Sequence, residues 1–303
     1  MSVLSGELYR LSTCSETVEL LEYLDSEKDQ LTLRENRMVY LLLKDLREMK
    51  KIPIDEFVAY QELLVKSEDI WHKAKEASDF EMFYPYLKEI FDTNRRFAGY
   101  VSPDMDPYEY CLDKFEKGLT VKACDEFFEK LKEEIVPLVK AISEKEQVDD
   151  SIRYGMFPAD LQEKLSYYLM KLMGLDLDHV GLSTTEHPFT TSLGSHLDER
   201  ITTHYHEDDF VSSMYSVIHE GGHALYDTGS ADDLVYTVLD CGVSMGIHES
   251  QSRFYENIIG RSRSFCEYIF PELEKLFPEQ MSGKTAEDLY IAVNKVEPSL
   301  IRK

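Results

Sequence analysis

Positive charge is scarce in this sequence. Lysine and arginine total 33 residues against 58 aspartates and glutamates, which gives a net charge of −25 at pH 7. Because nucleic acids and anionic membrane surfaces are bound through basic patches, this balance predicts a protein that binds neither. The longest apolar run, residues 38–43, is far too short to cross a membrane, and the N-terminal residues lack the pattern of a secretory signal.

Cysteine is also sparse, and glycosylation acceptors of the form Asn-x-Ser/Thr are absent. The five cysteines are odd in number, scattered and never spaced as Cys-x-x-Cys: they are Cys14, Cys111, Cys124, Cys241 and Cys266. A disulfide framework would need an even, closely spaced set in an oxidising compartment. We therefore expect reduced thiols in a cytoplasmic protein.

Helix-breaking residues are few in the first 175 residues, where apolar residues recur at helical spacing. Residues 80–97, 123–142 and 159–173 are each predicted to form an amphipathic helix with a buried stripe of large apolar side chains. Pro137 is expected to kink the second of these helices. The sequence thus predicts a mainly α fold.

Between His179 and His206 the composition changes to β-branched and polar residues. The segments that begin at Val180 and Arg200, with Gly194 between them, predict a small antiparallel β element. We therefore divide the chain into an N-terminal helical region, 1–175, and a second region, 176–303, and expect the two to form one continuous structural unit.

The stretch from His219 to His223 reads His-Glu-Gly-Gly-His and carries the clearest chemical signal. Two imidazoles four residues apart share one face of a helix, so both can reach one metal ion, and Glu220 lies beside them to accept a proton from water. Helical spacing of the preceding apolar residues places the motif mid-helix, with Ser212 or Ser213 as the N-cap. This pattern is typical of zinc peptidases.

Gly221 and Gly222 are unusual in the middle of a helix, where each costs roughly 1 kcal/mol relative to alanine. One explanation is that a metal ion or substrate needs close access to the helix at this point. The alternative is close packing of another helix.

A catalytic zinc site needs a third protein ligand and an open position for water. Glu249 is the first glutamate after His223 and lies in a second predicted helix, with Glu256 two turns later on the same side. A glutamate brought from a second helix to the two histidines is the gluzincin arrangement, so we expect Glu249 to be the third ligand. The rival candidates are His248, Asp240, His204, His206 and Cys241.

The motifs together resemble those of the thermostable carboxypeptidase (carboxypeptidase Taq) family of metallopeptidases. The family motifs HPF, DxRxT, HExxH and HES followed by Gln occur in order, at 187–189, 198–202, 219–223 and 248–251. The likeness covers nearly the whole chain, from Trp71 upstream to Val296–Arg302 downstream. The sequence departs from the family where its motif IRxxAD is interrupted after Ile301-Arg302-Lys303, and the later motif GxxQDxHW is absent.

The resemblance implies a zincin-type fold of long helices with a small β element beside the metal helix, in which 176–303 is the catalytic core. It implies metal ligands His219, His223 and Glu249, with Glu220 as general base in peptide hydrolysis by a metal-activated water. Zinc is the expected ion, with cobalt or another divalent metal as the alternative, and a homodimer is the expected assembly. The candidates for substrate binding are Arg302, which matches the IRxxAD arginine, and Arg200, His187 and His248.

The sequence therefore predicts a metal-dependent carboxypeptidase that acts on peptides, shortened at its C-terminal end relative to the family. Two alternatives stay open. One is an inactive metal-binding or peptide-binding fragment, because the absent motifs supply substrate-binding groups in the family. The other is an oligo-endopeptidase, because nothing before Arg302 enforces cleavage at a chain end.

Overall fold

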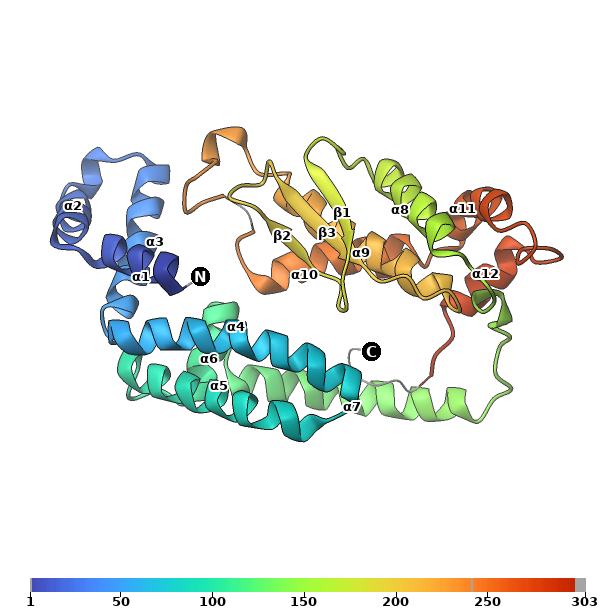
Figure 1. Cartoon of the computed structure of the whole chain (residues 1–303), viewed down its shortest axis with the longest axis horizontal. Coiled ribbons are helices and arrows are strands. Elements are labelled where there is room, and N and C mark those ends of the chain that lie inside the picture. Colours follow the sequence, from blue (N-terminus) through green and yellow to red (C-terminus); the bar gives the residue numbers. More distant parts are fainter. Residues whose placement is uncertain (1, 241, 298–303) are drawn as a thin grey trace. The chain divides into compact units, whose positions relative to one another are not determined.

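The computed structural model describes residues 2–240 and 242–297. The chain divides into two compact units, Met1–Val121 and Lys122–Lys303. It is mainly helical with one small sheet, as predicted (Figure 1). The predicted division lies near residue 175, where the composition changes. In the structure the division falls after Val121, so most of the helix at 121–143 and all of the helix at 159–173 belong to the second unit.

Every regular element among the described residues of the first unit is a helix. Its helices are α1 (Ser2–Thr13), α2 (Ser15–Ser26), α3 (Leu33–Met49), α4 (Ile54–Ala77), α5 (Phe80–Val101) and α6 (Pro107–Phe115), with a short 3-10 turn at Lys28–Gln30. Side chains define where helices begin: Thr32 and Glu35 form a reciprocal capping box at α3, and Asp79 accepts from the backbone of Met82 at α5. The predicted helix 80–97 therefore begins as expected and runs four residues further.

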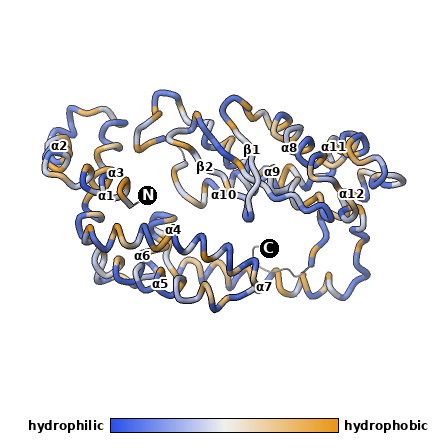
Figure 2. Tube along the Cα trace, in the orientation of Figure 1, coloured by the Kyte–Doolittle hydropathy of each residue, from blue (hydrophilic) through white to orange (hydrophobic). Residues whose placement is uncertain are grey.

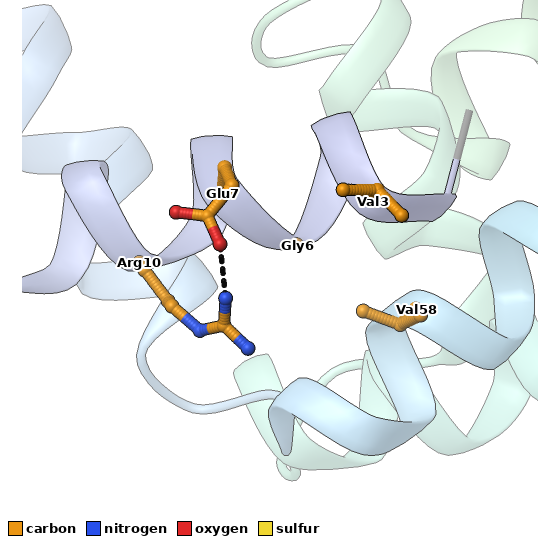
Figure 3. Close-up of a pocket in the computed structure, with 5 residues that line it drawn as sticks. All are labelled: Val3, Gly6, Glu7, Arg10 and Val58. Carbon is orange, nitrogen blue, oxygen red and sulfur yellow. Dashed lines mark hydrogen bonds and ion pairs between the residues drawn. The ribbon is translucent and has the colours of Figure 1, made fainter.

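A shallow cavity of about 240 Å³ lies beside α1 in the first unit (Figure 3). Its lining is Val3, Gly6, Glu7, Arg10 and Val58, and Arg10 forms an ion pair with Glu7 one helical turn away. The cavity contains none of the residues of the predicted metal site, all of which lie in the second unit.

The second unit combines helices with the sheet. Its elements are α7 (Val121–Ser143, which begins at the unit boundary), η2 (Ser151–Arg153), α8 (Ala159–Met173), β1 (Val180–Thr184), β2 (Thr190–Ser192), β3 (Glu199–Thr203), α9 (Phe210–Asp227), η3 (Asp232–Leu234), α10 (Met245–Arg253), the π-helix η4 (Phe254–Ile259), α11 (Arg263–Leu276) and α12 (Ala286–Val293). The helix predicted at 159–173 is confirmed with the same bounds.

The three strands form a mixed sheet in the order β1-β3-β2. β2 pairs antiparallel with β3, as predicted, but β1 pairs parallel with β3, from Val180 opposite Glu199 to Thr184 opposite Thr203. The predicted antiparallel pairing therefore applies to β2 and β3 but not to β1, because β1 and β2, although consecutive, lie on opposite sides of β3. Helix α9 packs against β3, which places the sheet beside the helix that carries the motif (Figure 1).

Helix α9 runs through the main hydrophobic core. Twelve of its eighteen residues are buried, and its first residue, Phe210, packs its ring 4.6 Å from that of Phe157 and 5.8 Å from that of Phe277. The N-cap is Asp209, whose side chain accepts from the backbone of Val211. The predicted cap at Ser212 or Ser213 was wrong, because the helix starts earlier and the Ser213 hydroxyl donates to a buried glutamine instead.

The predicted burial of the apolar stripe on α7 was also wrong. Pro137 lies inside the helix, which continues to Ser143, and none of its residues is buried. Phe127 is 60 % exposed and Ile135 43 % exposed. Figure 2 shows apolar residues interspersed along this helix. The stripe therefore satisfies the helical spacing without contributing to the core.

No helix among the described residues is both long and apolar enough to cross a membrane.

The two mid-helix glycines of α9 mark close helix packing. A Cβ atom on Gly222 would lie 2.8 Å from the Cα atom of Ser252 in α10 and 3.1 Å from the carbonyl oxygen of Gln251. A Cβ atom on Gly221 would meet the end of the Met173 side chain at 2.9 Å. Close packing of another helix therefore explains the two glycines. At Gly222 the backbone of α10 is the part that approaches.

We predict that Gly222→Ala lowers the free energy of unfolding, because α9 and α10 must separate to admit the methyl group. Such overpacking costs typically 1–3 kcal/mol, against a gain of roughly 1 kcal/mol in helix propensity. Urea denaturation followed by circular dichroism measures the change. Gly221→Ala is the matched control, because the flexible end of Met173 can turn aside.

A second control comes from Gly99 in α5, where a Cβ atom would meet nothing within 4 Å. Gly99→Ala should stabilise the protein by up to about 1 kcal/mol. If Gly222→Ala behaved like Gly99→Ala, the close contact between α9 and α10 would be contradicted.

Candidate metal centre

Three potential ligand atoms converge between α9 and α10. The Nε2 atoms of His219 and His223 lie 3.6 Å and 3.4 Å from Oε2 of Glu249. One ligand atom from each residue lies within 4.8 Å of the others, and the two imidazole rings are 5.0 Å apart. The structure thus brings together the three residues that the sequence predicts as metal ligands.

The spacing of these atoms fits a metal ion. Ligands at the usual 2.0–2.2 Å from a tetrahedral zinc ion lie roughly 3.3–3.6 Å from each other, which is close to both measured contacts. Two imidazoles and one carboxylate are also the donor types that zinc takes in catalytic sites. Because 47 % of the Glu249 side-chain surface is exposed, solvent reaches the ligand set from this side.

His219 is held from behind by a buried carboxylate. Its Nδ1 atom lies 2.8 Å from Oε2 of Glu256, which leaves Nε2 facing Glu249. Glu256 also contacts Arg253 at 3.1 Å and Arg261 at 3.3 Å. Burial opposes ionisation of Glu256, but the hydrogen bond with His219 and the two arginines outweigh it and lower its pKa. An ionised Glu256 is the partner that a metal-ligating imidazole ordinarily has.

The π-helix η4 gives Glu256 its position. The backbone N–H of Gly260 donates to the carbonyl of Tyr255, a five-residue step that is 2.7 Å long. The wider turn follows directly after α10, so Glu249 and Glu256 reach opposite nitrogens of the same imidazole. Single π turns of this kind occur frequently at functional sites.

His223 is neutral at physiological pH. Burial, together with the charges of His248 and His219, lowers its pKa to about 4. Its Nδ1 atom lies 2.5 Å from Nδ1 of His248, and Nε2 of His248 lies 2.9 Å from both carboxylate oxygens of Asp227. Above about pH 4 His223 is therefore a neutral imidazole, the form that binds a metal ion, and its Nε2 atom faces Glu249.

Glu249 is held in place by an arginine of its own helix. Nε of Arg253 donates to its Oε1 atom at 2.8 Å, while Oε2 faces the histidines. Burial raises the pKa of Glu249, but the hydrogen bond from Arg253 and the neighbouring His219 outweigh this and lower it. The carboxylate is therefore ionised at neutral pH, as a metal ligand must be.

Glu220 lies on the sheet side of the histidines and is only 7 % exposed. The hydroxyl of Thr190 in β2 lies 2.7 Å from its Oε2 atom and 3.0 Å from its backbone oxygen. The short strand β2 thus holds the carboxylate of Glu220, which is not one of the three grouped ligands. No motif in the sequence points to Thr190, because its position follows from the pairing of β2 with β3.

The rival third ligands lie elsewhere or have other partners. Nδ1 of His204 lies 2.9 Å from the carbonyl of Thr185, and Asp240 pairs with the buried His196. His206 is exposed, and Cys241 lies outside the described residues. In the described part of the chain, the one group of histidine, cysteine and acidic residues with metal-binding spacing is His219, His223 and Glu249.

The predicted substrate-binding residues are spread over the second unit. Arg200 is exposed on β3 and donates to Asp198 at 2.7 Å, and His187 is exposed before β2. His248 contacts His223 and Asp227. Arg302 lies outside the described residues. The structure therefore places His248 directly behind the imidazole of His223, in a polar layer formed with Asp227 and, behind His219, Glu256.

A buried acid, Glu199, lies close to this polar layer. It is fully buried in β3, the Ser192 hydroxyl donates to its Oε1 atom, and its Oε2 atom has no hydrogen-bond partner among the described residues. Burial raises its pKa to about 7, the Ser192 hydrogen bond opposes the rise, and the charge of Asp227 adds to it.

Comparison with known proteins gives a consistent result. The family model described as carboxypeptidase Taq (M32) metallopeptidase matches residues 1–303. Carboxypeptidase 1 of Bacillus subtilis is 39 % identical over 300 residues, which are 99 % of this chain and 60 % of that protein. Thermostable carboxypeptidase 1 of Pyrococcus furiosus is 35 % identical over 305 residues, covering 100 % of this chain and 60 % of that protein.

A solved structure shows the same likeness. The crystal structure of the M32 carboxypeptidase from Deinococcus radiodurans R1 superposes with a TM-score of 0.89 at 34 % identity, over 99 % of this chain and 60 % of that one. The chain therefore spans about three fifths of the length of these relatives.

The raised pKa of Glu199 predicts a pH-dependent cost in stability. Below pH 4.5 both the folded and the unfolded chain hold the proton, so the cost is absent. Between pH 4.5 and about 7 the unfolded chain loses the proton first, so stability falls as the pH rises. Glu199→Gln should therefore raise the free energy of unfolding by roughly 3 kcal/mol more at pH 8 than at pH 4.5.

Urea denaturation of the metal-free protein at the two pH values measures this difference. Glu274→Gln, a change to an exposed glutamate of α11, is the matched control and should show none. An equal effect of Glu199→Gln at both pH values would mean that the buried carboxyl ionises normally.

Proposed function

Because the chain belongs to the carboxypeptidase Taq (M32) metallopeptidase family, we propose that it is a metal-dependent carboxypeptidase that removes C-terminal residues from peptides. The observation that carries the proposal is the convergence of His219, His223 and Glu249 next to Glu220. Membership of a metallopeptidase family implies a divalent metal, and we propose zinc, which the two imidazoles and one carboxylate suit.

In this proposal His219, His223 and Glu249 hold the ion. A divalent metal in such a site supplies Lewis-acid polarisation of a peptide carbonyl and activation of water. Glu256 behind His219 and His248 behind His223 fix the orientation of the two rings, and the solvent-exposed side of Glu249 leaves room for water and substrate.

Glu220 is the proposed general base. Its carboxylate accepts the proton of the attacking water and then delivers it to the nitrogen of the leaving amine. The Thr190 hydroxyl fixes the direction of the carboxylate through one oxygen. The other oxygen is the atom assigned to proton transfer.

Recognition of the chain end needs a cation for the substrate carboxylate. Arg302 is the proposed group, on the basis of the family motif, but it lies outside the described residues. Arg200 is a weaker candidate because Asp198 already pairs with its guanidinium. A homodimer and a cytoplasmic location also stay predictions from the resemblance and the composition.

We predict that Glu220→Gln abolishes hydrolysis while zinc binding is retained. Loss of a general base reduces turnover typically 100-fold to 10,000-fold, whereas the three metal ligands are untouched. Peptide digestion followed by mass spectrometry measures turnover, and competition with a chelating dye measures zinc affinity. Glu274→Gln is the control. Full activity of Glu220→Gln would contradict the proposed mechanism.

A second prediction separates the proposed activity from its alternatives. A peptide with a free C-terminus should lose residues from that end, whereas the same peptide with an amidated C-terminus should stay intact. Internal cleavage of the amidated peptide would indicate an oligo-endopeptidase. Stoichiometric zinc with no product from either peptide would indicate a metal-binding chain without turnover, an outcome made relevant by its coverage of only 60 % of the relatives' length.

A further inference from the structure

We infer that His248 is a positioning residue for the metal ligand His223, whose ring it holds by accepting a hydrogen bond from Nδ1. The inference rests on the proposed metal centre, since it concerns the ring nitrogen that His223 turns toward the ion. It also gives His248 a different role from the substrate binding expected from its place in the motif.

The Nε2 atom of His223 faces Glu249 at 3.4 Å. A metal ion bound at this atom takes its lone pair, so the proton of the neutral ring must sit on Nδ1. Nδ1 lies 2.5 Å from Nδ1 of His248. Since the His223 atom donates this hydrogen bond, the His248 atom must accept it.

The position of the proton on His248 follows from that on His223. An accepting Nδ1 requires a neutral His248, so when His223 binds a metal ion the one proton of the His248 ring sits on Nε2. That atom lies 2.9 Å from both oxygens of Asp227, and an ionised carboxylate can only accept. Asp227 is 4 % exposed, so water does not compete for the contact. The protons in this chain of hydrogen bonds can therefore take one arrangement when Nε2 of His223 binds a metal ion.

The ring of His248 is also held sterically. The Tyr226 ring packs edge-on against it at 5.2 Å, and a Cβ atom on Gly242 would lie 2.6 Å from its Cδ2 atom. Both ring nitrogens already have protein partners. His248 is thus enclosed and hydrogen-bonded on both sides, which suits a fixed support for His223 rather than a group that receives a substrate.

Two amide substitutions separate the two hydrogen bonds of His248. In His248→Asn the amide oxygen can occupy the position of Nδ1, which keeps an acceptor for His223 but gives up the reach to Asp227. In His248→Gln the longer side chain can place its amide nitrogen at the position of Nε2, which keeps the donor to Asp227 but removes the acceptor for His223. His206→Gln, a change to an exposed histidine of the same unit, is the control.

The measurement is the affinity of the full chain for Zn²⁺, by competition with a chelating dye. Loss of the support of a ligand typically weakens metal binding 10-fold to 100-fold, and we expect this for His248→Gln. His248→Asn should retain affinity within a few-fold of the unaltered chain, and His206→Gln should not change it. If His248→Gln bound Zn²⁺ as tightly as His248→Asn, or more tightly, the inference would be overturned.

If His248 only filled space, His248→Gln should bind Zn²⁺ more tightly than His248→Asn, because glutamine fills the space of histidine better than asparagine does. Circular dichroism and urea denaturation of the metal-free variants identify any loss of folding. Nitrogen-15 NMR of the Zn²⁺-loaded chain gives an independent readout: Nε2 of His248 should carry the proton and Nδ1 should not. A proton on Nδ1 would contradict the inference even if the affinities agreed.

These outcomes are distinguishable from failure of the proposed function. If the unaltered chain binds no Zn²⁺, the metal centre itself is wrong, and both proposals fail together. If it binds Zn²⁺ and the two amide variants rank in the wrong order, only the role of His248 is wrong. If Zn²⁺ binds and the variants rank as expected but no peptide is cleaved, the role of His248 stands and the enzymatic proposal fails.

Discussion

The metal centre depends on the backbone contact between α9 and α10 at Gly222. One histidine pair on one helix cannot close a metal site, so a second helix has to bring Glu249 within about 3.5 Å of both imidazoles. A side chain at position 222 would push the Ser252 backbone away, and Glu249 is only three residues from that contact. The distance from the two histidines of α9 to Glu249 of α10 is thus set by the absence of a side chain at Gly222, next to His223.

A second constraint is the polar layer behind the imidazoles. Glu256 and Asp227 are largely buried, where an unpaired carboxylate would be costly. Glu256 is compensated by two arginines and His219, and Asp227 by His248. The two ligating histidines therefore differ: His219 contacts a carboxylate directly, whereas His223 contacts one through a second imidazole. In both cases the hydrogen bonds that orient the imidazole ring also compensate a buried carboxylate.

The grouping of the three proposed ligands could be predicted from the sequence because spacing on a helix has fixed geometry. His219 and His223 share a face whatever surrounds them, and the first glutamate of the next helix completed the set. Thr190 and the parallel pairing of β1 could not be predicted, because both depend on where three short strands pair. The stripe on α7 was misjudged for a related reason: amphipathic spacing shows that a helix can be buried, but only its contacts show whether it is.

The position of the ligands on two helices also ties metal binding to the lifetime of the protein. His223 and Glu249 are separated by a long connection that contains little regular structure beyond η3 among its described residues, and a bound ion would join its two ends. An ion that binds only the folded chain stabilises it by about 2.7 kcal/mol when its free concentration is 100 times the dissociation constant. Because proteases act on opened chains, a bound ion would then also slow degradation of the chain.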